Sequence, residues 1–220
     1  MLELYFLLET PIPGSVPQPL PPEVRRQTID SSLWSQEEKA SLLQHRAYLI
    51  QRFPIKDDVP KTFIEIYRQA VTIPSVIGIA NPIARTAHHI RWAQKIFTDG
   101  LESIALKTPP LHLWTGLGLI QVELSLNDLL QGRTAQTWLR THGYEQFALP
   151  NLAHPLQEIR EVGWIHSLFE VLFDWMYFEK RILRGGEAIE VPERGRYLVQ
   201  DLGESLLALI EWKEPMNGDT

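Results

Sequence analysis

The sequence of 220 residues contains no cysteine. This absence excludes disulfide bonds, thiolate metal ligands and a cysteine nucleophile together. It is also typical of proteins that stay in a reducing compartment, where thiol pairs do not persist as structural bonds. We therefore expect the protein in the cytoplasm.

Long hydrophobic runs are also missing. No part of the sequence approaches the roughly 18 uninterrupted apolar residues of a membrane-spanning helix. The apolar residues 1–9 lack a basic flank and include Glu3 and Glu9, so they do not have the pattern of a signal peptide. We interpret this segment as a buried strand and expect no membrane partner.

Positive charge is not in excess. The chain has 21 Lys and Arg against 27 Asp and Glu, which gives a formal net charge of -6. A chain with this balance has no broad positive field to neutralise phosphates, so we expect no nucleic-acid partner. The partner that the sequence allows is another protein, or a second copy of this chain.

The motifs of common chemistries are absent as well. The sequence has no phosphate-binding loop, no Gly-x-Ser-x-Gly, no EF-hand loop and no His-x-x-x-His. The Gly116-Leu117-Gly118 segment lacks the third glycine and the strand-to-helix setting of a dinucleotide site. We expect no cofactor and no metal, and no catalytic residue can be assigned.

The composition itself is that of a folded domain. Apolar residues make up 44% and charged residues 22%, far from the signature of disorder. We expect one globular domain over residues 1–220, with residues 1–108 and 109–214 as alternative sub-halves on either side of Pro109 and Pro110. The proline-rich residues 10–22 predict an extended connection, and residues 215–220 predict a frayed tail.

Periodicity predicts both helices and strands. Helices are expected after a Ser35–Glu38 capping box, over residues 63–71 behind Asp57 and Asp58, from Thr86 to Asp99, and over residues 156–182. Strands are expected at residues 1–9, 47–53, 76–80, 112–123, 134–141, 188–191, 197–199 and 206–212, with a loop at 127–133. The fold class that follows is α+β, a mostly antiparallel sheet with helices packed on one face. Two fused ferredoxin-like halves are an alternative arrangement of the same elements.

The last third of the chain carries a family resemblance. Residues 138–152, with Thr141, Gly143 and the Phe147-Ala148-Leu149-Pro150 run, resemble a segment of a DUF4261-like family of bacterial domains of unknown function. The resemblance continues through the long helix to the turn at residues 183–191. It implies a compact bacterial α+β domain and supplies no activity or catalytic residue.

The first candidate site is an aromatic and basic segment at Trp138, Arg140, His142 and Tyr144. The sequence has 7 Trp, and aromatic residues beside Arg are enriched where protein interfaces bury surface. We expect these four side chains to be exposed together, with Leu139 and Phe147 buried behind them. On this hypothesis, the chain is a non-enzymatic protein that binds or regulates another bacterial protein through these four side chains.

The second candidate site is a pocket that collects Arg85, His88 and His112 from separate elements. It would serve the alternative function, a small-molecule or metal-assisted enzyme. His88 and His89 are adjacent, with Arg91 and Trp92 close behind. Since neighbours on a helix point about 100° apart, we expect one of these histidines buried and one exposed.

Overall fold

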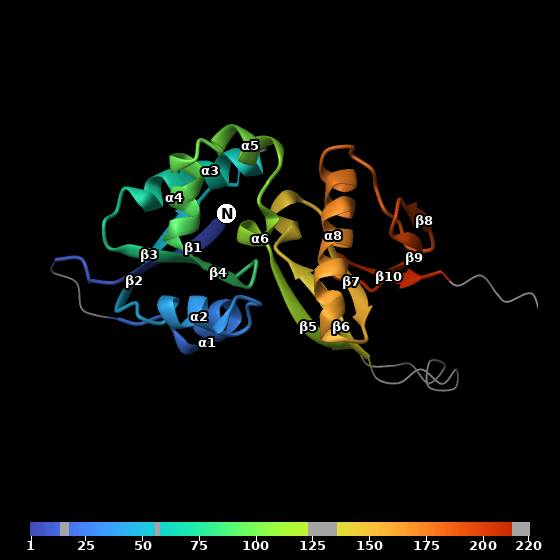
Figure 1. The fold of residues 1–220 in the computed structure, drawn as a ribbon, viewed down its shortest axis with the longest axis horizontal. Helices are drawn as coiled ribbons and strands as arrows, with labels where there is room; N and C mark the ends of the chain where they lie inside the picture. The colour runs from blue at the N-terminus through green and yellow to red at the C-terminus, as the bar shows by residue number, and fades with distance from the viewer. Residues whose placement is uncertain (14–17, 56–57, 123–135, 213–220) are drawn as a thin grey trace, which may run out of the picture. The chain divides into compact units, whose positions relative to one another are not determined.

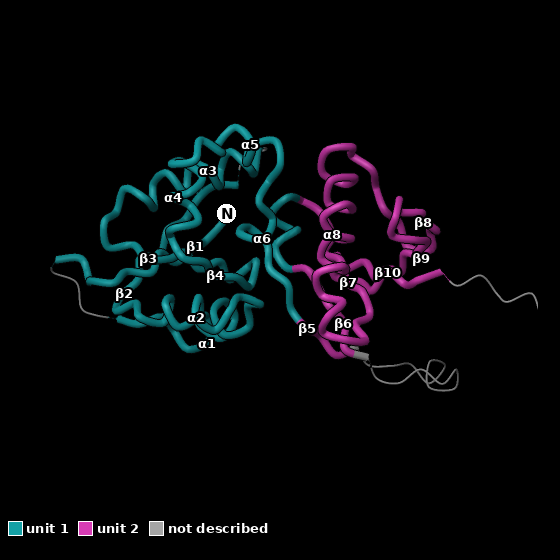
Figure 2. Tube along the Cα trace, viewed as in Figure 1, with its two compact units in different colours: residues 1–118, 142–147 teal, residues 119–141, 148–220 magenta. Residues whose placement is uncertain are grey.

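The computed structural model describes residues 1–13, 18–55, 58–122 and 136–212. The chain forms two compact units, residues 1–118 with 142–147 and residues 119–141 with 148–220 (Figure 2). Both units contain helices and strands, and the predicted α+β class is confirmed. The predicted loop at residues 127–133 and the predicted tail at residues 215–220 lie outside the described residues.

The first unit is built on a four-stranded antiparallel sheet. Its strands are β1 (Leu2–Leu8), β2 (Ala47–Phe53), β3 (Val76–Asn81) and β4 (Thr86–His89), in the order β2-β1-β3-β4. The predicted strand at 47–53 is confirmed with the same ends. Strand β1 lies between β2 and β3, because its run of apolar side chains can be buried on both faces.

Helices cover both faces of this sheet rather than the single face expected. Figure 1 shows α3 (Val59–Val71) and α4 (Ile90–Thr98) above the sheet and α1 (Pro22–Arg25) and α2 (Gln36–Leu42) below it. Alternation along the strands explains the two layers. Tyr5 and Leu7 pack with Leu42 of α2, whereas His88 of β4 is bonded to Tyr67 of α3.

A π-helical turn, η1 (Arg26–Asp30), follows α1 directly. Helices α5 (Glu102–Lys107) and α6 (Leu111–Trp114) and the 3-10 turn η2 (Tyr144–Phe147) complete the unit. Its element order is not the βαββαβ order of a ferredoxin-like half.

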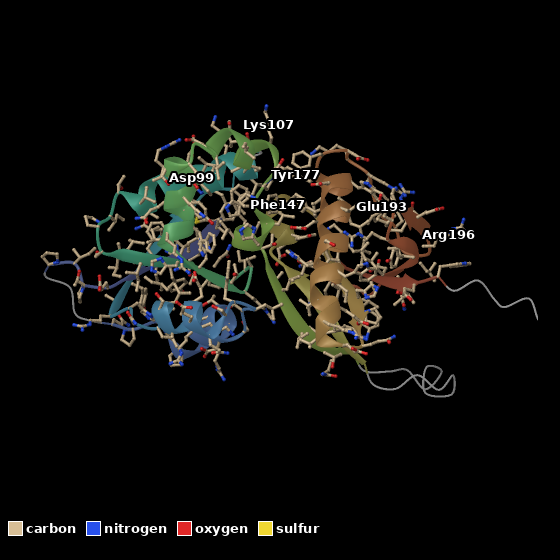
Figure 3. All side chains as sticks on the ribbon, viewed as in Figure 1. Asp99, Lys107, Phe147, Tyr177, Glu193 and Arg196 are labelled. Carbon is tan, nitrogen blue, oxygen red and sulfur yellow. The ribbon has the colours of Figure 1, made fainter. Side chains whose placement is uncertain are left out.

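The first unit extends beyond the predicted division at residue 108 because α6 belongs to its core. The ring of Trp114 stacks on Phe63 of α3 at 4.8 Å with an interplanar angle of 8°. Phe147 lies beside α6 (Figure 3), and its ring is 6.5 Å from that of Phe63. The expected strand at 112–123 therefore begins only at Gly116, after the helical turn.

The helix expected from Thr86 begins later than predicted. Thr86–His89 pairs with β3 as a strand, and the helix starts at Ile90. His89 caps it by accepting the Arg91 N–H at 3.1 Å on Nδ1. The apolar stripe of the predicted helix is the one that α4 buries, at Ile90, Ala93 and Ile96.

The second unit has a mixed sheet in the order β5-β6-β7-β10-β9-β8. The strands are β5 (Gly116–Val122), β6 (Gln136–His142), β7 (Asn151–Leu156), β8 (Ala188–Val191), β9 (Gly195–Asp201) and β10 (Leu206–Glu211). Strands β7 and β10 run parallel, whereas the pairs β6–β7, β9–β10 and β8–β9 are antiparallel.

One long helix, α8 (Val162–Tyr177), follows the 3-10 turn η3 (Ile159–Glu161). It buries an apolar stripe that includes Ile165, Leu168 and Phe169. The predicted helix over residues 156–182 starts too early, because residues up to Leu156 belong to β7. None of the helices in the described part of the chain has the length and apolar character to cross a bilayer.

Candidate functional site

The first predicted site is largely buried. Trp138, His142 and Tyr144 are 6%, 4% and 2% exposed, so the prediction that they form a surface is wrong for these three, and Arg140 is only partly exposed. The prediction for the residues behind them is confirmed, because Leu139 and Phe147 are buried.

The burial of Trp138 has a physical cause in the sheet. Strand β6 lies between β5 and β7, and alternation does place Trp138 and Leu139 on opposite faces. Both faces are apolar, however, since Trp138 packs with Ala153 and Ala208 of neighbouring strands. In addition, Trp138 and Arg140 belong to the second unit, whereas His142 and Tyr144 belong to the first.

The second predicted site divides between core and surface. His88 is 2% exposed, and its Nε2 shares a hydrogen bond of 2.8 Å with the Tyr67 hydroxyl. Burial, with smaller contributions from His112 and His89, lowers the pKa of His88 to about 3, so its ring is neutral at pH 7. Arg85 and His112 are exposed.

His88 and His112 are close enough to interact electrostatically, because His112 contributes to the lowered pKa of His88. Of these two, only His112 is exposed, so a substrate could reach His112 but not His88. Arg85 occupies the β3–β4 turn, with a φ of 48°. Among residues 1–13, 18–55, 58–122 and 136–212, no three His, Asp or Glu side chains gather as a metal site requires. Of the adjacent histidines, His88 is buried and His89 is partly exposed.

A different cluster lies at β4, the edge strand of the first sheet. Trp34, just before α2, stacks on Trp92 of α4 with ring centroids 6.0 Å apart and an interplanar angle of 27°. The rings of Trp34 and of His112, on α6, meet edge to face, with centroids 6.4 Å apart and an interplanar angle of 67°. Both indoles are partly exposed and the imidazole is exposed, so the three rings form a continuous accessible group.

Two cations border these rings. The guanidinium carbon of Arg91 is 5.6 Å and the Lys95 Nζ is 5.9 Å from the Trp92 ring centroid, within the range of a cation–π interaction. Both side chains are exposed. We call Trp34, Trp92 and His112, with Arg91 and Lys95, the aromatic surface.

Glu38 of α2 holds the aromatic surface in place from beneath. Its carboxylate, 4% exposed, accepts the Trp92 Nε1–H at 2.9 Å and the His89 N–H at 3.3 Å. It also pairs with the Arg91 guanidinium. These contacts satisfy a carboxylate that would be costly to bury alone, and they fix α4 against α2.

The role of Glu38 differs from the one that the sequence predicted. Ser35 caps α2 as expected, because its Oγ accepts the Glu38 N–H at 3.2 Å. The Glu38 carboxylate does not complete a capping box, since its oxygens are bonded to α4. The sequence did single out His89, Arg91 and Trp92 as a polar and aromatic group. It could not indicate Trp34 and Glu38 as their partners, because these lie more than 50 positions earlier.

Comparison with known proteins assigns no role to these residues. No family model, no curated protein and no solved structure matches the chain. The resemblance of the last third to a DUF4261-like family therefore stays a prediction.

Proposed function

We propose that the protein is a non-enzymatic binding module that holds another protein through the aromatic surface. The observation that carries the proposal is the pair of stacked, partly exposed indoles of Trp34 and Trp92 beside Arg91 and Lys95. Tryptophan and arginine dominate the residues that contribute most to protein–protein affinity. Large rings also bury much apolar area while few torsions become fixed.

The support beneath the aromatic surface favours binding as well. Trp92 and Arg91 are both bonded to the buried Glu38, so their positions are set before a partner arrives. A preorganised surface loses less side-chain entropy on association.

The charges indicate the chemistry of the partner. The charge of Arg91 is largely offset by Glu38, but no described residue forms an ion pair with Lys95. A partner would therefore bring an apolar anchor for the two indoles and an acidic side chain for Lys95. We expect this complex in the cytoplasm, on the ground of the cysteine-free sequence.

Photo-crosslinking from a residue next to the aromatic surface tests the proposal. Leu33, which precedes Trp34 and is 48% exposed, is replaced by a benzophenone amino acid in cells of the source organism. The same replacement at Trp212, which is 46% exposed in the second unit, is the matched control. We expect one abundant protein to be linked from position 33 and not from position 212.

Two other outcomes are informative. Linkage to a second copy of the chain would show self-association through the aromatic surface instead of a different partner. Equal labelling from both positions, or none from position 33, would contradict the proposal.

A further inference from the structure

The first unit contains a cleft of about 680 Å³ on the face opposite α3 and α4. The apolar part of its lining, which we call the apolar wall, consists of Pro19, Leu20 and Pro22, from the proline-rich connection and the start of α1, with Leu43 after α2. The charged part, which we call the charged wall, consists of Arg25, Arg26 and Asp30 on α1 and η1. Sites for small molecules in proteins have volumes of roughly 300–1,000 Å³, so the cleft is large enough for one.

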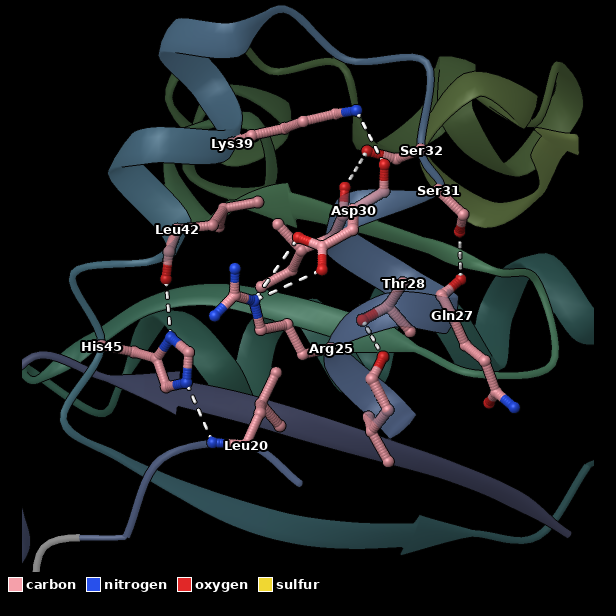
Figure 4. Close-up of polar contacts among 12 residues, drawn as sticks. Leu20, Arg25, Gln27, Thr28, Asp30, Ser31, Ser32, Lys39, Leu42 and His45 are labelled. Carbon is pink, nitrogen blue, oxygen red and sulfur yellow. Dashed lines mark hydrogen bonds and ion pairs between the residues drawn. The ribbon is translucent and has the colours of Figure 1, made fainter. Parts of the chain in front are cut away.

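His45 fixes the apolar wall. Figure 4 shows its ring between Leu42 and Leu20, where Nε2 accepts the Leu20 N–H at 3.1 Å and Nδ1 donates to the Leu42 carbonyl at 2.7 Å. An Nε2 that accepts a hydrogen bond requires the proton on Nδ1, so both nitrogens of the ring are used. Leu20 is therefore tied to the loop before β2 by a hydrogen bond as well as by packing.

The charged wall is equally well supported. The π-helical turn closes with the Ser31 N–H donating to the Arg26 carbonyl at 3.1 Å. The buried hydroxyls of Thr28 and Ser32 donate to the Val24 and Ile29 carbonyls, both at 2.8 Å (Figure 4). π-Helical turns are rare and occur frequently at functional sites.

The charges of the cleft do not cancel. Arg25 contacts Asp30 through a long Nε–Oδ1 distance of 3.4 Å, and both side chains are exposed. No hydrogen bond or ion pair joins the Arg26 guanidinium to another described residue. The lining thus contains two arginines and one carboxylate, which leaves an excess positive charge in a protein whose net charge is -6.

We infer that this cleft binds a small organic anion with an apolar body. The carboxylate of the ligand pairs with Arg26 and with the weakly held Arg25, since a planar guanidinium matches a carboxylate with two parallel hydrogen bonds. Its hydrocarbon part covers Pro19, Leu20 and Leu43. This site is separate from the aromatic surface and does not depend on the function proposed for it.

Calorimetric titration of the full chain with three probes tests the inference. Octanoate has both the carboxylate and the apolar body, octanamide lacks the charge, and acetate lacks the apolar body. We expect octanoate to bind at least about tenfold more tightly than either of the others, since a hydrogen-bonded charge is worth about that factor.

Variants assign the two parts of the ligand to the two walls. Arg26→Ala should weaken octanoate about tenfold and leave octanamide unchanged, because the exposed guanidinium contacts only the charge. Leu43→Ser should weaken both. Lys61→Ala, an equal charge change on the exposed face of α3, is the control and should change neither.

Three results would overturn the inference. They are equal affinity for octanoate and octanamide, an Arg26→Ala variant that binds octanoate as the wild type does, and no binding of octanoate at concentrations up to about 10 mM. Arg26 is exposed, so an unchanged melting temperature of Arg26→Ala will show that any loss of binding is local.

Discussion

At the scale of single residues, Glu38 is the side chain on which most of the candidate site depends. Glu38→Ala leaves the Trp92 indole N–H and the His89 backbone N–H without an acceptor. Both donors are only partly buried, but each loses a hydrogen bond to a charged group, which contributes about 1.5 kcal/mol, and Arg91 can be rehydrated because it is exposed. We expect a decrease of about 2–3 kcal/mol in the free energy of unfolding, measured with urea.

Glu37→Ala is the matched control for this substitution. Glu37 is the neighbouring residue on α2, carries the same charge and is exposed. Its removal should change the free energy of unfolding by less than about 0.5 kcal/mol. If the two variants were equally stable, the carboxylate of Glu38 would not hold α4 in solution.

His88 predicts a dependence of stability on pH. Its folded pKa of about 3 lies below the unfolded value of 6.5, so between these values the unfolded chain binds a proton that the folded chain does not. The contribution of the neutral His88 ring to the free energy of unfolding is fully present above pH 6.5. It is lost as the pH falls towards 3, by about 1.4 kcal/mol per pH unit for this one group.

The comparison with His88→Gln isolates this contribution from the titration of carboxylates. Glutamine can still be bonded to the Tyr67 hydroxyl but does not titrate. The free energy of unfolding of the wild type should fall more steeply than that of the variant from pH 6.5 to pH 4. Parallel curves would show that His88 is protonated in the folded protein.

At the scale of elements, helix caps are where local sequence determines structure most directly. Asp58 was expected to cap the helix that follows it, and its carboxylate accepts the Lys61 N–H at 3.0 Å. Asp57 lies outside the described residues. Asp58→Ala should therefore reduce the free energy of unfolding by about 1 kcal/mol, measured by thermal or urea unfolding.

Asp58→Asn distinguishes the cap from a simple charge effect. Asparagine supplies an equivalent acceptor oxygen and is an equally good capping residue. It should retain nearly all of the stability that Asp58→Ala loses. An equal loss in both variants would mean that the charge of Asp58, and not its hydrogen bond, supports α3.

Elements with a strong local pattern were predictable, and those that depend on distant pairing were not. Strands β2 and β8 have the predicted ends, because their residues and flanking turns favour a strand on their own. Strand β7 was missed because it contains Pro155, which usually argues against a strand. In the structure, β10 pairs only with residues 151–153, so Pro155 is not required to donate on that side.

The candidate site was predictable to a lesser degree. Its residues on α4 form a local group in the sequence, but their partner Glu38 has the spacing of a capping box, which predicts a different role for its carboxylate. The segment around Trp138 has the residue types of an interface, and only the order of the six strands shows that its side chains are buried.

At the scale of the whole molecule, the chain leaves the first unit and returns to it at residues 142–147. Gln146 links this return to the rest of the unit. Asn81 Nδ2 donates to its Oε1 at 2.8 Å, and its own Nε2 donates to the carbonyls of Gly143 and Trp114 at 2.8 and 3.2 Å. The first unit is therefore not complete in residues 1–118.

Gln146→Met tests this dependence. Methionine keeps most of the volume of the buried side chain but none of these hydrogen bonds. We expect a loss of about 3 kcal/mol in the free energy of unfolding and faster amide exchange in residues 76–89, measured by mass spectrometry. Unchanged exchange there would contradict the role of Gln146 as the link.

The most direct measurement of the proposed function is the affinity of the cross-linked partner for a Trp34→Ser, Lys95→Glu double variant. Both side chains are at least partly exposed and neither is bonded to Glu38, so the fold should be unaffected. We predict that the dissociation constant rises at least about 100-fold, since each change removes a contact of about 1.4 kcal/mol or more. A Trp212→Ser, Lys61→Glu variant, with the same two replacements at exposed positions elsewhere, should bind as the wild type does. An unchanged dissociation constant for the folded Trp34→Ser, Lys95→Glu variant would contradict the assignment of the aromatic surface as the binding site.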